Sequence, residues 1–149
     1  MAKKKPTNRC SFEGCKRNRS QRYMHCEGHR TKITIGRFLG YIYTQMNKRV
    51  RGTSGTKRPD LYLGLPILPR DVFITWSKNH PDFLSMYKRW FSSGFDRKLT
   101  PSVNRMNSSK GYILGNIEWM TNSQNCGLSG MVKSMNQKKA IYELLGVNK

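Results

Sequence analysis

The chain is poor in acidic residues and has no long hydrophobic run. Only 8 Asp and Glu stand against 28 Lys and Arg in 149 residues, which gives a formal charge of +20 at pH 7. Such an excess predicts a polyanionic partner and argues against a metabolic enzyme with a small neutral substrate. No apolar run approaches the roughly 18 residues of a membrane span, and no signal peptide is recognised. We therefore expect a cytoplasmic protein with no membrane partner.

The basic residues are unevenly distributed. Residues 1–58 hold 16 Lys and Arg against 2 acids, a net +14, whereas residues 59–149 hold 12 against 6, a net +6. The first part is therefore predicted to be the main electrostatic arm. An aromatic content of 11% is too high for a disordered basic tail, while a hydrophobic content of 36% predicts a modest core.

The chain has only four cysteines. In a reducing compartment these are expected to be metal ligands or free thiols rather than disulfides. Cys10, Cys15, Cys26 and His29 follow the pattern C-x4-C-x10-C-x2-H, which offers the four ligands of a closed, structural Zn²⁺ site. A segment so small and polar would draw its folding free energy from the metal. Two alternatives stay open: free thiols in a disordered arm, and His25 as fourth ligand, although it directly precedes Cys26.

Hydrophobic periodicity predicts helices over residues 33–50 and 69–79, and a third from Pro81 to before Gly94. Residues 99–121 instead predict two short strands joined by a turn at residues 107–111, with a short helix beginning near Thr121. Trp90 and Trp119 are expected in the core, and Tyr112 is expected to pack in the loop. Cys126 is predicted to be a small buried residue of the last helix.

Residues 96–130 carry the most specific pattern in the sequence. They resemble the core of HNH (ββα-metal) endonucleases, and more closely a phage-type subgroup with Asp-Arg in place of Asp-His. A Cys/His cluster before the nuclease core is also familiar in that subgroup, so the resemblance spans most of residues 10–126. The core positions that match are Pro101, Ser102, Val103, Arg105, Gly111, Tyr112, Asn116, Trp119, Thr121 and Asn125.

The resemblance implies one divalent cation, Mg²⁺ or another, bound to the scissile phosphate. Asn104 and Asn125 stand at the two metal-ligand positions, and Asn116 stands where an Asn holds the loop. Arg105 occupies the position of the usual general-base His and is expected to contact phosphate. The base must then come from outside the motif, and its candidates are His80, Tyr87, Tyr62, Tyr43 and Tyr112.

The chain departs from the family pattern at Asn104, where the pattern has Asp. An amide oxygen can coordinate Mg²⁺ but brings no negative charge. Three explanations stay open: a weak or inactive member that keeps DNA binding, an inactivated variant, or another acid that supplies the charge. Asp96 and Glu118 are the nearby acids, although both are expected at the surface.

The predicted protein is thus α+β: a zinc-stapled N-terminal module, helices, and an HNH-like core. Its predicted parts are a basic tail (1–9), a zinc-binding module (10–30), a basic helix and loop (31–68), an HNH-like nuclease domain (69–130) and a C-terminal tail or helix (131–149). The residues expected to bind nucleic acid are Lys16, Arg17, Arg19, Arg22, Arg30, Arg37, Lys48, Arg49, Arg51, Lys57 and Arg58.

The expected partner is double-stranded DNA, with RNA less favoured and a homodimer left open. If the protein is phage-encoded, the expected location is the host cytoplasm. Two rival hypotheses are a non-catalytic DNA- or RNA-binding regulator on an HNH scaffold and an RNA- or ribosome-associated zinc protein.

Overall fold

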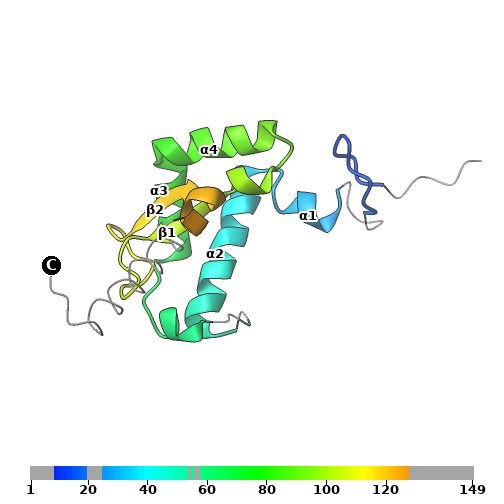
Figure 1. The fold of residues 1–149 in the computed structure, drawn as a ribbon. Coiled ribbons are helices and arrows are strands. Elements are labelled where there is room, and N and C mark those ends of the chain that lie inside the picture. Colours follow the sequence, from blue (N-terminus) through cyan, green and yellow to red (C-terminus); the bar gives the residue numbers. More distant parts are fainter. Residues whose placement is uncertain (1–8, 20–24, 54, 56–57, 128–149) are drawn as a thin grey trace, which may run out of the picture.

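A computed structural model describes residues 9–19, 25–53, 55 and 58–127. Within them the chain is α+β, with helices packed around a two-stranded antiparallel sheet. In Figure 1, α4 runs above the hairpin and α2 descends beside it, while the cysteine-bearing segment and α1 lie at one end. The elements are α1 (Glu27–Arg30), α2 (Ile35–Arg51), η1 (Pro59–Leu61), α3 (Arg70–Asn79), α4 (Pro81–Ser92), η2 (Arg97–Leu99), β1 (Pro101–Arg105) and β2 (Ile117–Thr121).

The long helix α2 confirms the prediction over residues 33–50 and begins two residues later. The Thr34 hydroxyl accepts a hydrogen bond from the Arg37 backbone N–H at 3.3 Å, which caps the first turn. The helix ends at Gly52, whose φ of 73° is the left-handed conformation that glycine adopts most readily. Burial of an apolar stripe outweighs the low helix propensity of the two internal glycines. The stripe consists of Phe38, Leu39, Met46 and Val50.

Helices α3 and α4 also confirm their predictions and form the other wall of the core. They meet at His80, and Pro81 opens α4 because proline lacks only an N–H that the first turn leaves unpaired. The rings of Phe83 on α4 and Trp119 on β2 lie 4.5 Å apart between centroids. Trp90 and Trp119 are 1% and 5% exposed, so both are core residues as predicted.

The hairpin has one apolar and one polar face. Its register places Val103 opposite Trp119 and Asn104 opposite Glu118. Val103 and Trp119 are buried, whereas Asn104 and Glu118 are half-buried. Because successive side chains of a strand alternate between faces, the hydrophobic pair turns towards α4 and the polar pair turns away.

A helical segment follows the hairpin directly over residues 122–127. The Gln124 N–H donates to the Thr121 hydroxyl at 3.2 Å, and the Gln124 side-chain carbonyl accepts from the Thr121 N–H at 2.9 Å. This reciprocal pair is a capping box and confirms the helix start expected near Thr121. The Asn125 side-chain amide then donates to the Ser102 hydroxyl at 3.0 Å, which ties the helical segment to β1.

One burial prediction was wrong. Cys126 is exposed rather than buried. Successive helical residues are rotated by about 100°, so when Asn125 faces β1 the next side chain turns to solvent. The tail and the weak helical pattern predicted for residues 131–149 lie outside the described residues. Among those that are described, no helix is long and apolar enough to cross a membrane.

Candidate functional site

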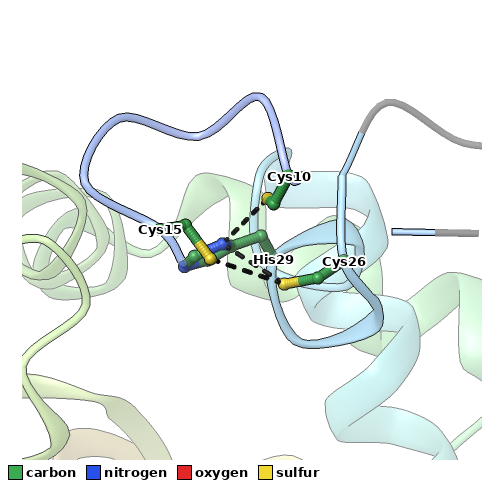
Figure 2. Close-up of side chains that lie close together, drawn as sticks. All are labelled: Cys10, Cys15, Cys26 and His29. Atoms are coloured by element: carbon green, nitrogen blue, oxygen red, sulfur yellow. Dashed lines mark hydrogen bonds between the residues drawn. The ribbon is translucent and has the colours of Figure 1, made fainter. Parts of the chain in front are cut away.

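The three N-terminal cysteines and one histidine converge on a single point, as Figure 2 shows. The His29 Nδ1 atom lies 3.4 Å from Cys10 Sγ and 3.5 Å from Cys26 Sγ, and Cys15 Sγ lies 4.0 Å from Cys26 Sγ. All four ligand atoms are within 4.8 Å of one another. A tetrahedral Zn²⁺ ion separates sulfur from sulfur by about 3.8 Å and sulfur from nitrogen by about 3.6 Å. The cluster therefore has the dimensions to hold a metal ion.

Short-range backbone hydrogen bonds place these ligands. The Cys10 N–H donates to the Arg17 carbonyl at 3.0 Å, which closes the loop that carries Cys15. Cys26 is the N-cap residue of α1, and His29 follows on the same helical turn. The histidine that reaches the sulfurs is His29, so the alternative with His25 as fourth ligand is not the arrangement in this structure.

The cluster also shifts the acidity of its thiols. Burial alone would raise the pKa of Cys10, but hydrogen bonds from the backbone of Cys26 and Phe12 and from the His29 side chain lower it to about 6. The backbone of Arg17 acts to lower the pKa of Cys15, yet burial and the two neighbouring sulfurs raise it overall. Cys10 therefore has thiolate character near neutral pH, which is the form that binds metal.

An aromatic stack attaches the Cys/His cluster to the end of α4. The Phe12 ring lies 4.2 Å from the His29 ring and 5.1 Å from the Phe95 ring, measured between centroids. Phe95 has a φ of 68°, the only positive value of a non-glycine residue in the described part of the chain. This backbone conformation is costly for a bulky side chain, and here it turns the ring towards the cluster. Because Phe12 contacts both His29 and Phe95, we expect the ordering of the Cys/His cluster and its packing against the end of α4 to depend on each other.

A cleft of about 480 Å³ lies beside the hairpin, far from the Cys/His cluster in sequence. Three of its lining residues stand at the positions that the motif assigns to metal and phosphate: Asn104 and Arg105 from β1, and Asn125 from the helical segment. The rest of its wall comes from α2, from η1 and the residue after it, from β1, from the loop between the strands and from the helical segment. Those residues are Arg49, Leu61, Tyr62, Ser102, Val103, Ser108, Tyr112, Asn122 and Cys126.

Asn116 holds the loop between the strands from inside. This residue is 4% exposed. Its carbonyl oxygen accepts from the Asn107 N–H at 2.9 Å, and its amide donates to the carbonyls of Asn107 and Gly111 at 3.1 and 2.9 Å. A Cβ at Gly111 would collide with the Pro66 carbonyl, so only glycine fits there. These contacts set the position of Tyr112, which lines the cleft and whose N–H donates to the Pro66 carbonyl at 2.8 Å.

Asn104 does not present its amide group freely to the cleft. Its Nδ2 donates to Glu118 Oε1 at 2.8 Å, so the amide and the carboxylate form one hydrogen-bonded pair across the two strands. Amide and carboxylate oxygens are suitable ligands for Mg²⁺. This donor set carries a single negative charge, that of Glu118, and no acidic residue lines the described cleft. The oxygen atoms are therefore of the kind that binds a divalent cation, but one negative charge attracts such a cation only weakly.

The two acids proposed to replace the missing Asp differ in position. Asp96 caps η2 by accepting from the Lys98 N–H at 3.0 Å, and it does not line the cleft. Glu118 is next to Asn104 across the sheet. The structure therefore leaves Glu118 as the nearer source of a carboxylate.

The candidates for a general base fall into two groups. The hydroxyls of Tyr43 and Tyr87 donate to backbone carbonyls outside the cleft, and His80 packs against Trp76. Only Tyr62 and Tyr112 line the cleft. Burial raises the pKa of Tyr112 in spite of the nearby Arg49, which keeps that hydroxyl protonated.

The predicted nucleic-acid-binding cations are spread over several elements. Arg58 pairs with Asp60 at 3.0 Å, and among the described residues of this set only Arg49 lines the cleft. The sequence placed Arg49 in a basic helix but gave no signal that this helix end approaches the hairpin. Exposed members are Lys16, Arg17, Arg37, Lys48, Arg51 and Arg58, half-buried members are Arg19, Arg30 and Arg49, and Arg22 and Lys57 lie outside the described residues.

Comparison of the chain with protein-family models, curated proteins and solved structures gives no match. A functional interpretation must therefore rest on the motif and on the geometry of these two sites.

Proposed function

We propose that the chain is an HNH-type endonuclease that binds double-stranded DNA and hydrolyses its phosphodiester bonds with a divalent cation. The observation that carries the proposal is the cleft itself. Asn104, Arg105 and Asn125, which the motif assigns to metal and phosphate, line one cavity although they lie on a strand and on a separate helical segment. The order strand, strand, helix that brings them together is also the order expected of a ββα-metal core.

Each side chain of the proposed site has a distinct task. Asn104 and Asn125 would hold the divalent cation with their side-chain oxygens, and Glu118, hydrogen-bonded to Asn104, would supply a negative charge. The cation, when bound, would stabilise the charge that develops on the phosphate and on the leaving 3′-oxygen. Arg105 would hold a phosphate oxygen. Asn116 fixes the loop that shapes the cleft.

The charge distribution favours a nucleic-acid backbone as the bound partner. After the 8 acids of the chain are counted against its 28 Lys and Arg, a net charge of +20 remains, which favours a polyanionic partner. Arg37, Lys48 and Arg51 of α2 are exposed and do not belong to its buried apolar stripe. Cations of this kind contact phosphates, and such contacts position a protein on DNA without reading its bases. Affinity for duplex DNA should therefore fall steeply as salt is raised.

The Cys/His cluster is proposed to be a structural Zn²⁺ site. Its four ligand atoms lie within 4.8 Å of one another, and four protein ligands would leave no open position for a reacting water. Cys10, Cys15, Cys26 and His29 would bind the ion. Its role would be to order residues 10–30 and to hold them against Phe95.

A second candidate function is non-catalytic DNA or RNA binding on the same scaffold. One observation favours it: the Asn104 amide is hydrogen-bonded to Glu118 at 2.8 Å, so the carboxylate already has a partner without a metal. In that case the cleft would retain its phosphate contacts and lack hydrolytic activity.

Nicking of supercoiled plasmid in Mg²⁺ or Mn²⁺ by the present chain and by Asn104→Asp separates the two candidates. A nuclease scaffold with one weakened ligand predicts slow or absent nicking by the present chain and metal-dependent nicking by the variant. Absence of nicking by both, with intact DNA binding, would support the binding protein instead. Competition between duplex DNA and structured RNA at one salt concentration tests the choice of nucleic acid.

A further inference from the structure

Arg49 is a partly buried cation, and no acidic side chain in the described part of the chain forms an ion pair with it. It lies near the C-terminal end of α2, lines the cleft, and is half-buried. Among the described residues, the ion pairs formed by carboxylates involve Arg58 and His80, and neither involves Arg49. Buried charges in proteins are normally paired, because removing an ion from water is costly. The missing partner of Arg49 is therefore expected to be an anion that enters the cleft.

The guanidinium of Arg49 is held in place by tyrosines rather than by acids. Its Nη1 donates to the Tyr112 hydroxyl at 3.3 Å, and its Cζ lies 5.7 Å from the centre of the Tyr62 ring. Burial acts to lower the pKa of Arg49, but the neighbouring tyrosine hydroxyls, Tyr112 first, raise it. The negative end of the α2 dipole offsets about half a unit charge at most. Arg49 thus remains fully charged, and residues 9–19, 25–53, 55 and 58–127 offer it no full counter-charge.

A second guanidinium is fixed in the same place. The Cζ of Arg105 lies 4.3 Å from the centre of the Tyr62 ring and 5.3 Å from that of Tyr112, and these two rings are nearly parallel at 15°. Its Nη1 donates to the Ser108 and Lys110 carbonyls at 3.0 and 3.1 Å. Both arginines are therefore positioned before any ligand arrives, which reduces the entropic cost of binding.

We propose that Arg49 is a phosphate-binding residue of the cleft, and that Arg49 and Arg105 together form a two-guanidinium site for the DNA backbone. Guanidinium groups bind phosphate through paired N–H donors. Tyr112 acts as a positioning residue, since its hydroxyl accepts from Arg49 and thereby orients it. The inference rests on the DNA partner of the proposed function and is independent of whether the bound strand is cleaved.

The test compares full-length variants that lose the same charge at two places. Arg49→Gln removes the cleft cation, while Arg89→Gln removes an exposed cation of α4 that does not line the cleft. Binding of a fluorescent duplex oligonucleotide is measured by anisotropy over a range of salt concentrations. Arg49→Gln should weaken affinity about tenfold and make the slope of log K against log salt less steep by about 0.9. Arg89→Gln should change affinity less than about twofold.

Tyr112→Phe tests whether the effect of Arg49→Gln comes from misfolding, since it keeps the ring and removes only the hydroxyl that orients Arg49. It should weaken DNA binding in the otherwise unchanged chain and have little further effect in the Arg49→Gln background. Equal affinities and salt slopes for the unchanged chain, Arg49→Gln and Arg89→Gln would overturn the inference, whatever the nicking assay gives. A selective effect of Arg49→Gln, together with no nicking by either the present chain or Asn104→Asp, would support the phosphate site and remove only the nuclease proposal.

Discussion

Replacing Asn104 with Asp should destabilise the metal-free protein at neutral pH. The change removes the hydrogen bond that Nδ2 donates to Glu118 Oε1 at 2.8 Å, and bonds to charged groups contribute about 1.5–3 kcal/mol. It also places two carboxylates opposite each other on the sheet. Two unit charges 4 Å apart repel by about 4 kcal/mol at an effective dielectric constant of about 20, and half-burial and relaxation reduce that figure. We expect a total loss of about 2–4 kcal/mol.

Thermal unfolding with and without divalent cation measures this loss. For a chain of 149 residues each kcal/mol corresponds to roughly 2–4 °C, so Tm should fall by about 4–16 °C at pH 7. Repulsion raises the folded-state pKa of one carboxyl above its unfolded value, so the deficit should shrink as pH falls towards about 5 and the pair takes up a proton. Mn²⁺ at about 100 times its Kd should return about 2.7 kcal/mol.

The matched control is Asn104→Asp combined with Glu118→Gln, which restores one negative charge and one amide with their positions exchanged. It should recover most of the Tm and respond less to Mn²⁺. If Asn104→Asp keeps the parental Tm at pH 7 and Mn²⁺ does not shift it, these two side chains do not form the pair described here.

Three further predictions concern the metal cluster, the loop and the core. Purified protein should contain about one Zn²⁺ per chain by elemental analysis. Cys26→Ser should lose the Zn²⁺ and the packing of the Cys/His cluster against Phe95, whereas Cys126→Ser, at an exposed position, should retain both. Equal zinc content in the two variants would show that Cys26 is not a ligand. Asn116→Ala should lower the free energy of unfolding by about 3 kcal/mol in urea titrations, since three hydrogen bonds of a buried side chain are lost at about 1 kcal/mol each. A loss below about 1 kcal/mol would contradict the role given to Asn116 in holding the loop. Burial raises the pKa of Tyr87 in the folded protein, so this tyrosine contributes its full stabilisation below the unfolded pKa of about 10 and loses it as pH rises above that value. The free energy of unfolding of Tyr87→Phe should therefore fall less steeply between pH 9 and 11 than that of the unchanged chain. Equal slopes for the two proteins would refute this prediction.

The sequence predicted the elements of this fold well, because their signals are local. The stripe of α2, the proline that opens α4 and the capping residue Thr121 each act over one or two helical turns. The spacing of Cys10, Cys15, Cys26 and His29 likewise predicted which residues form the Cys/His cluster.

The contacts between distant segments were not predictable in the same way. Arg49 and Tyr112 lie far apart in the chain, and their contact depends on how α2 packs beside the hairpin. The pairing of Asn104 with Glu118 required the strand register, which a one-residue shift would have altered. The exposure of Cys126 depended on which side of a short helical segment faces β1.

One paired measurement decides whether the cleft is a metal-dependent phosphodiesterase site. Plasmid nicking and duplex affinity are determined for Asn104→Asp and for Asn104→Asp combined with Asn125→Ala, in the same buffer with Mg²⁺. We expect the second change to lower the nicking rate by about 100-fold or more, on the order of 2.7 kcal/mol in the barrier, and to alter affinity less than about threefold. Equal nicking by both variants, or none by Asn104→Asp, would contradict this expectation.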